Sequence, residues 1–327
     1  MTSLPRNLDV LEPHDHRLLV SEPMKVMGAR SRVPLSECGV VTADRYENFE
    51  VVHDAENETC WWFMNPVGRP SFTLPLLRDM TRAQHASKRI FDANAGRLPY
   101  KYVVLASRTP GIFNLGGDLA YFVDRIRDGD RAAMTRYAHQ CTEVVYRNTT
   151  AFDVPVITIA LVQGDTLGGG FECALSLNMI VAEKSAKMGL PEILFNLFPG
   201  MGAYSFLSRR LDVVRAEKLI TNGRLYSAAE LHEMGIVDVL AEDGQGEATL
   251  REYIATHRRK WSAHYAILQA RQRVKPVTRE ELLDVTDIWV DAAMRLPESD
   301  LRKMERLVAS QNRRMATLHQ APTAIVA

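Results

Sequence analysis

Residues 164–202 read GDTLGGGFECALSLNMIVAEKSAKMGLPEILFNLFPGMG, a segment built around a triple glycine. The preceding residues 154–163, VPVITIALVQ, form a β-branched run that predicts a buried strand. Residues 171–177 have the apolar spacing of a helix, so the glycines are expected at a helix N-terminus. Glycine lets a ligand approach the backbone N–H groups, and a helix N-terminus favours an anion. The segment therefore predicts half of an oxyanion hole.

Two glutamates accompany these glycines. Glu172 lies in the first turn of the predicted helix, so one element offers both an N–H donor and a carboxylate. Taken alone, Glu172 is equally explained as a residue that complements the helix dipole. Residues 179–182 predict a second strand, after which Pro191 fixes the backbone before Glu192. Without its context, Glu192 has the character of a solvated loop residue.

An upstream loop offers a second donor. Residues 102–106, YVVLA, predict another buried strand, and the loop that follows ends in FNLGGDL at residues 113–119. A helical pattern continues from there, which places the Gly117 N–H at a helix start. A Gly-Gly-Asp sequence on its own is also explained as a simple turn with a helix cap.

Together these motifs resemble the crotonase (enoyl-CoA hydratase/isomerase) superfamily. The family pattern is Phe-x-x-Gly-x-Asp-Leu, then Gly-Gly-Gly-x-Glu, then Pro-Glu and Pro-Gly-x-Gly. All four motifs occur here in that order, and the resemblance extends over residues 46–239. The wording LGGGFECALSLNMIVAE and MGLPEILFNLFPGMGAYSFL is most similar to the diffusible signal factor synthases, which make cis-2-unsaturated fatty acid signals.

The resemblance implies roles only where the motifs match. The N–H groups of Gly117 and Gly169 would bind the thioester oxygen, and Glu172 and Glu192 would be the acid/base pair. Where many hydratases have Ala-Gly-Ala-Asp, this chain has Leu-Gly-Gly-Asp at residues 115–118, a change that preserves a backbone donor. Further candidate substrate contacts are Leu115, Gly116, Gly168, Met201, Tyr204, Leu207 and Trp289, the last four as the lining of an apolar acyl tunnel.

The implied reaction is dehydration of a 3-hydroxyacyl thioester, carried on acyl carrier protein or coenzyme A, followed by hydrolysis to a free cis-2-enoic acid. An oxyanion hole stabilises both the enolate and the tetrahedral intermediate of hydrolysis. Two neighbouring carboxylates raise at least one pKa, so that one is protonated while the other is ionised. The alternatives are an enoyl-CoA hydratase or isomerase without hydrolysis, and a non-catalytic acyl-binding protein. No further cofactor is expected.

Composition agrees with a small-molecule enzyme. The chain has 327 residues, 46% hydrophobic and 24% charged, and its formal net charge of zero disfavours nucleic-acid binding. The four cysteines form no C-x-x-C pair or Cys/His ligand cluster, which predicts neither a disulfide scaffold nor a metal site. No membrane span or secretory signal is recognisable, so we expect a cytoplasmic protein. By analogy with the superfamily we expect a homo-oligomer, such as a trimer.

The predicted architecture is α/β. Three parts are expected: an N-terminal extension (1–45), a spiral core of stacked ββα turns as the resemblance implies (46–245), and a C-terminal helical region (246–327). An opening hairpin is predicted between residues 47 and 66, with its turn at residues 56–58. Because side chains alternate along a strand, only one of the adjacent Trp61 and Trp62 is expected to face the core.

Overall fold

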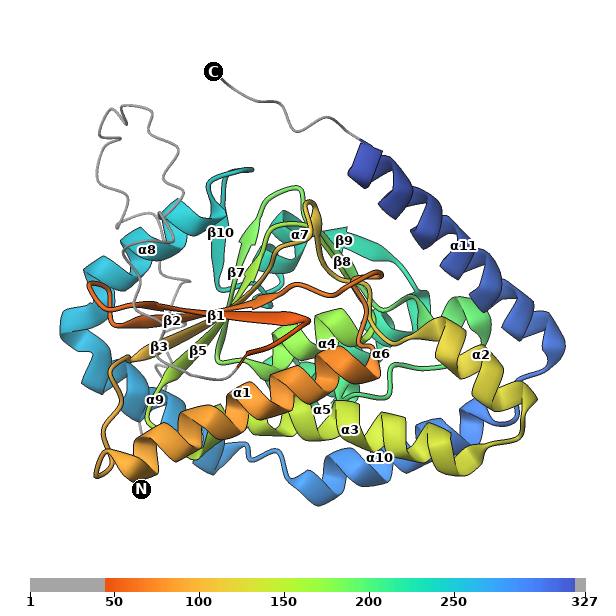
Figure 1. Ribbon diagram of the computed structural model, residues 1–327, viewed down its shortest axis with the longest axis horizontal. Helices are drawn as coiled ribbons and strands as arrows, with labels where there is room; N and C mark the ends of the chain where they lie inside the picture. The colour runs from red at the N-terminus through yellow and green to blue at the C-terminus, as the bar shows by residue number, and fades with distance from the viewer. Residues whose placement is uncertain (1–44, 321–327) are drawn as a thin grey trace, which may run out of the picture. The chain divides into compact units, whose positions relative to one another are not determined.

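A computed structural model describes residues 45–320, so nearly all of the expected N-terminal extension lies outside the described residues. Over this range the chain is an α/β structure with two β-sheets and a helical C-terminal region, as expected (Figure 1). The strands are β1 (Phe49–Asp54), β2 (Thr59–Met64), β3 (Tyr102–Ser107), β4 (Ile112–Asn114), β5 (Ile157–Val162), β6 (Asp165–Leu167), β7 (Met179–Glu183), β8 (Lys187–Gly189), β9 (Leu225–Ser227) and β10 (Val239–Ala241).

Helices follow most strand pairs and fill the C-terminal region. The α-helices are α1 (Leu74–Ala93), α2 (Leu119–Arg127), α3 (Arg131–Thr149), α4 (Gly169–Ser176), α5 (Ala203–Arg210), α6 (Val213–Asn222), α7 (Ala228–Glu233), α8 (Gly246–His257), α9 (Trp261–Val274), α10 (Arg279–Ala293) and α11 (Glu298–Gln320). Short 3-10 helices are η2 (Ala151–Asp153), η3 (Pro191–Phe195) and η4 (Arg258–Lys260). Within the described range, no helix is both long and apolar enough to cross a bilayer.

The two sheets are built by the same repeating connection. The larger sheet has the order β1-β2-β3-β5-β7-β10 and the smaller one β4-β6-β8-β9. Each of β3, β5 and β7 runs into a short strand of the smaller sheet, and helical segments follow before the chain returns. The strands of successive turns pair in parallel, except at the β1–β2 and β8–β9 edges. These stacked ββα turns form the expected spiral.

The opening hairpin is buried on both faces. Trp61 and Trp62 are 2% and 3% exposed, so the expectation that only one of them faces the core was wrong. Trp62 packs in the main core, whereas Trp61 belongs to a second apolar cluster that includes Leu250 and Ile254 of α8. The C-terminal helices α8 and α9 therefore cover the outer face of the larger sheet (Figure 1).

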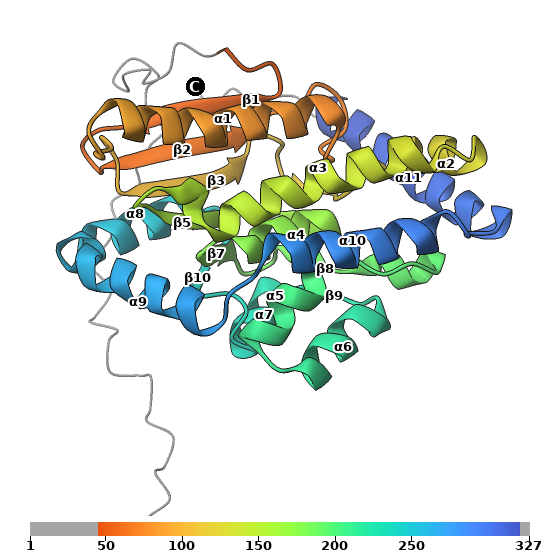
Figure 2. The same cartoon turned by 90° about the horizontal axis from the view of Figure 1, so that it is seen from below.

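The helices on the other face form the walls of the site. Figure 2 shows α3 between α1 and α10, and α3 also contacts α4. At one end of this layer, α11 packs beside α2 and contacts η3. Elements far apart in the sequence thus surround the N-terminus of α4.

Candidate active site

The first backbone donor lies in the loop between β4 and α2. Gly116 has a positive φ of 88°, and its carbonyl accepts a hydrogen bond from the Phe72 N–H at 2.8 Å. Asp118 then caps α2 through the Tyr121 N–H and pairs with Arg69 at 2.8 Å. The capping interpretation of Gly-Gly-Asp is therefore correct, and it leaves the Gly117 N–H between two fixed residues.

The second donor lies at the start of α4. A Cβ on Gly170 would lie 2.3 Å from the Asn114 carbonyl oxygen, so only glycine lets α4 approach β4 this closely. A Cβ on Gly169 would lie 3.5 Å from the Gly117 nitrogen, which places the two loops side by side. Among the residues that the structure describes, neither the Gly117 nor the Gly169 N–H donates to a protein acceptor. Both glycines line the same cavity, so both N–H groups are available to a ligand there.

Glu172 projects from the first turn of α4 and is 1% exposed. Its Oε1 accepts hydrogen bonds from the N–H groups of Met201 and Ala203, at 2.8 and 2.9 Å. Burial raises the pKa of Glu172 to about 7, and the hydrogen bonds from Ala203 and Met201 oppose that rise. The PGMG turn at residues 199–202 therefore serves as a cradle for this carboxylate.

Glu192 approaches from η3. The residue as a whole is half-buried, but its Oε2 is buried and has no hydrogen-bond partner within the described part of the chain. Burial, and then the charge of Glu172, raise the pKa of Glu192 well above its ordinary value. The charge of each carboxylate disfavours that of the other, so a state in which one of them holds a proton is favoured over one with two charges.

Both glutamates and both donors line one cavity of about 230 Å³. Its remaining wall is largely apolar and includes Phe122, Ala138, Leu197, Met201, Trp289 and Leu307. The apolar wall suits an acyl chain, and the two donors and two carboxylates suit a reaction in which the carbonyl oxygen of that acyl group becomes negatively charged.

Five of the seven candidate substrate contacts line this cavity: Leu115, Gly116, Gly168, Met201 and Trp289. Tyr204 and Leu207 do not, which corrects that part of the expectation. Tyr204 is 39% exposed, and its hydroxyl donates to Glu217 at 2.9 Å. Leu207 is fully buried in the main core. Both lie inside α5, whose first residue follows the PGMG turn, so helical rotation turns them away from the cavity that Met201 lines.

The sequence did not single out the residues of α3 and α11 that line the cavity. Tyr137, Ala138 and Cys141 of α3 line the cavity, as do Leu307 and Gln311 of α11. The spacing of Tyr137 and Cys141 on one helical face was a usable signal. Burial raises the pKa of the Cys141 thiol, so no thiolate nucleophile is expected there. Among the described residues, no group of three or more His, Cys, Asp or Glu could hold a metal ion.

The chain matches the Enoyl-CoA hydratase/isomerase family over residues 87–306. Methylglutaconyl-CoA hydratase of Rattus norvegicus is 30% identical over 57% of this chain and 55% of its own length. Cyclohexa-1,5-dienecarbonyl-CoA hydratase of Thauera aromatica is 34% identical over 43% of this chain and 55% of its own length. The chain thus spans about half the length of these curated relatives.

Solved structures show the same fold. Enoyl-CoA hydratase from Bacillus halodurans superposes with a TM-score of 0.65 at 19% identity, covering 79% of this chain and 98% of that one. Pseudomonas aeruginosa DspI superposes with a TM-score of 0.58 at 21% identity, covering 85% of this chain and 96% of that one. Because the family match covers residues 87–306, more than half of the sequence, the chain belongs to the enoyl-CoA hydratase/isomerase family of the crotonase superfamily.

Proposed function

We propose that this enzyme is a diffusible signal factor synthase, which dehydrates a 3-hydroxyacyl thioester and then hydrolyses the thioester to release a free cis-2-enoic acid. The observation that carries the proposal is that the carboxylates of Glu172 and Glu192 and two backbone donors line one apolar cavity. The relatives named above are hydratases of CoA thioesters, which supports an acyl-thioester substrate.

In the first step the two backbone donors bind the thioester. The thioester oxygen accepts from the Gly117 and Gly169 N–H groups, which stabilise negative charge on that oxygen by several kcal/mol in a water-poor site. Glu172, held by two N–H groups, is the ionised partner, and Glu192, without a hydrogen bond at Oε2, holds the proton. Glu172 removes the C2 proton, and the electron pair of that bond moves into the enolate.

Loss of water completes the dehydration. The enolate collapses to the C2–C3 double bond, the C3–O bond breaks, and Glu192 protonates the departing hydroxyl. The products are the enoyl thioester and one water. Glu172 is now protonated and Glu192 ionised, which is the reverse of the starting state.

This reversed state suits hydrolysis. Ionised Glu192 takes a proton from a water that attacks the thioester carbonyl carbon, and the tetrahedral oxyanion forms at the same two donors. When the C–S bond breaks, Glu172 protonates the leaving sulfur. The free acid and the carrier thiol leave, and both glutamates return to their starting protonation states. We further propose an acyl carrier protein or coenzyme A as the carrier, a cytoplasmic location and a homo-oligomeric assembly.

Product analysis by mass spectrometry tests the proposal. Purified protein is incubated with 3-hydroxydodecanoyl thioesters of acyl carrier protein and of coenzyme A, beside the isosteric variants Glu172→Gln and Glu192→Gln. Glu252→Gln, at an exposed position of α8, is the matched control. We expect free cis-2-dodecenoic acid from the wild type and the control, and none from the two site variants.

Two outcomes would overturn it. Thioester-bound trans-2-enoyl product without free acid would identify a hydratase that lacks hydrolysis. Tight binding of the acyl thioester without turnover, equal in the wild type and both site variants, would identify a non-catalytic acyl-binding protein.

A further inference from the structure

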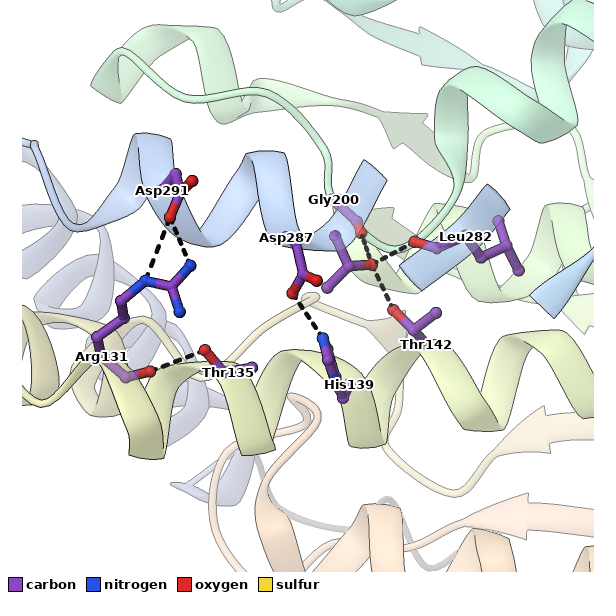
Figure 3. A network of polar contacts seen from close by, with 9 residues as sticks. Arg131, Thr135, His139, Thr142, Gly200, Leu282, Asp287 and Asp291 are labelled. Atoms are coloured by element: carbon purple, nitrogen blue, oxygen red, sulfur yellow. Dashed lines mark hydrogen bonds and ion pairs between the residues drawn. The ribbon is translucent and has the colours of Figure 1, made fainter. Parts of the chain in front are cut away.

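A buried hydroxyl of α10 contacts the PGMG turn that holds Glu172. The Oγ1 of Thr286 lies 2.9 Å from the Gly200 carbonyl oxygen and 2.7 Å from the Oγ1 of Thr142 on α3. Both threonines are 1% exposed. In Figure 3, dashed lines run from the labelled Thr142 and Gly200 to the one side chain that carries no label. Three segments far apart in the sequence therefore meet at one hydroxyl.

The contact continues to the catalytic carboxylate through a single peptide group. The carbonyl of Gly200 and the N–H of Met201 belong to the same peptide unit, and that N–H donates to Glu172 Oε1 at 2.8 Å. The hydrogen bonds thus run from Thr286 to the Gly200 carbonyl, and from the Met201 N–H to Glu172. Thr142 can donate to the Thr286 oxygen, which leaves the single Thr286 proton to be shared between the carbonyl oxygens of Gly200 and, at 2.7 Å, Leu282.

This series of hydrogen bonds affects both the position of its last donor, the Met201 N–H, and the strength of the hydrogen bond that this group donates. A hydroxyl that donates to a carbonyl polarises the peptide group and makes its N–H a better donor, and the effect is larger in a buried, low-dielectric setting. We infer that Thr286, supported by Thr142, is a positioning residue that holds and polarises the Gly200–Met201 peptide for Glu172. The inference rests on the proposed function, because it assumes that Glu172 is the base.

A second contact fixes the same peptide from the apolar side. A Cβ on Gly200 would lie 2.3 Å from the Cγ of Trp289, three residues after Thr286 on α10. Trp289 also lines the cavity. One helix therefore supplies both an apolar and a polar contact to the turn that cradles the carboxylate.

The same two helices are joined on their exposed side by contacts that do not reach the site. His139 Nε2 lies 2.7 Å from Asp287 Oδ1, and Arg131 Nη2 lies 2.6 Å from Asp291 Oδ1 (Figure 3). Breaking one of these contacts weakens the α3–α10 contact without touching Gly200. The chain thus contains its own control for an effect of helix docking alone.

Other groups around Glu172 stay the same in the test. The charge of Glu172 acts on Glu192 of η3 and on the thiols of Cys141 on α3 and Cys173 on α4. Burial, then the charge of Glu172, raise the pKa of the Cys141 thiol. The second donor to Glu172, the Ala203 N–H, has no contact with Thr286 among the hydrogen bonds of the described residues.

The test compares Thr286→Val, which keeps the branched shape but removes the hydroxyl, with Thr286→Ser, which restores it. We expect Thr286→Val to lower kcat roughly tenfold, as for loss of a hydrogen bond that supports a charged group, with little change in KM. The ascending limb of the pH–rate profile should move to higher pH, because a weaker donor favours protonated Glu172. Thr286→Ser should recover both, and Asp287→Asn should leave the profile in place.

A direct titration separates this inference from the proposed function. In protein labelled with ¹³C at glutamate carboxyls, the Glu172 signal is assigned by its absence from Glu172→Gln, and its midpoint is measured in the wild type and Thr286→Val. An upward shift supports the relay even if no thioester is turned over. Identical titrations, or an equal shift in Asp287→Asn, would overturn the relay and leave the proposed function intact. An inactive wild type with the shift present would overturn only the function.

Discussion

The carboxylate of Glu192 lies directly against the α-carbon of Gly168, where an added Cβ would be 2.3 Å from Oε1. Gly168 also has a positive φ of 51°. Gly168→Ala should therefore push the flexible end of Glu192 away from the cavity while the fold persists. We expect kcat to fall roughly 10- to 100-fold, the usual cost of displacing a catalytic group by about 1 Å. Steady-state kinetics with the acyl thioester checks this.

Gly129→Ala is the matched control for that substitution. Gly129 has a comparable φ of 66°, and a Cβ there would meet nothing within 4 Å. Both variants carry the backbone strain of alanine at positive φ, and Gly168→Ala should lose the more stability in thermal unfolding, because the ψ of −124° at Gly168 lies outside the left-handed helical region. Only Gly168→Ala should lose activity. An equal loss of activity in the two variants would assign the effect to strain instead.

The raised pKa of Glu192 predicts a pH-dependent gain of stability in Glu192→Gln. Between the unfolded-state pKa near 4.5 and the higher native value, the native state binds more protons than the unfolded state, so the free energy of unfolding falls as pH rises. Glutamine removes this loss. We expect the free energy of unfolding of the variant to exceed that of the wild type by an amount that grows between pH 5 and pH 8.

Urea unfolding at the two pH values measures this gain, with Glu252→Gln as the exposed control. Parallel pH dependences of the wild type and Glu192→Gln would mean that Glu192 is ionised normally in the native state. The starting state of the proposed reaction, in which Glu192 holds a proton, would then have no support.

Ala138 offers a test of where the acyl chain lies. It is 5% exposed on α3 and lines the cavity, so Ala138→Leu should fill space at that wall. We expect kcat/KM for 3-hydroxydodecanoyl thioester to fall about tenfold relative to 3-hydroxyhexanoyl thioester, as overpacking costs about 1–3 kcal/mol. Ala132→Leu, on the exposed face of the same helix, should leave the ratio unchanged. A uniform loss for both chain lengths would place the acyl chain elsewhere.

The parts of the fold that the sequence predicts are those encoded by local patterns. The hairpin, the buried strands β3, β5 and β7, and the glycine-led start of α4 follow from alternation, β-branched runs and glycine placement. The motifs around Glu172 and Glu192 can also be recognised from the sequence, because each is a short local pattern. Their contacts are not local, however: the N–H groups that hold Glu172 come from 29 and 31 residues further along the chain.

The expectations that were wrong concern side chains whose surroundings depend on the rotation of a helix or on a second layer of structure. Tyr204 and Leu207 could not be placed, because the face that they occupy depends on the residue at which α5 begins. The pairing of Thr142 with Thr286 joins positions 144 residues apart, and neither residue lies in a motif. Trp61 and Trp62 point to opposite faces of β2, and Trp61 is buried only because α8 packs on its face of the sheet.

Arg251 of α8 shows how the C-terminal region supports the opening hairpin. Its Nη1 lies 2.6 Å from Asp54 Oδ2 at the end of β1, and its guanidinium lies 4.8 Å from the centre of the Trp61 ring. The side chains of Arg251 and Asp54 are only 24% and 9% exposed, so solvent screens this contact weakly. Arg251→Ala should therefore lower the free energy of unfolding by about 2 kcal/mol, through loss of the charged hydrogen bond and the cation–π contact.

The comparison is with Arg215→Ala, which breaks a 2.6 Å pair with Asp212 whose side chains are 59% and 50% exposed. Because exposed pairs contribute about 0–1 kcal/mol, that variant should unfold nearly as the wild type does in urea. If α8 and the hairpin unfold as one unit, Arg251→Ala shifts a single transition, and the tryptophan fluorescence and the helical circular dichroism change together. A separate early loss of the helical signal would instead show that the sheet is stable without α8. The burial of Trp61 by α8 would then not be needed for the sheet to stay folded.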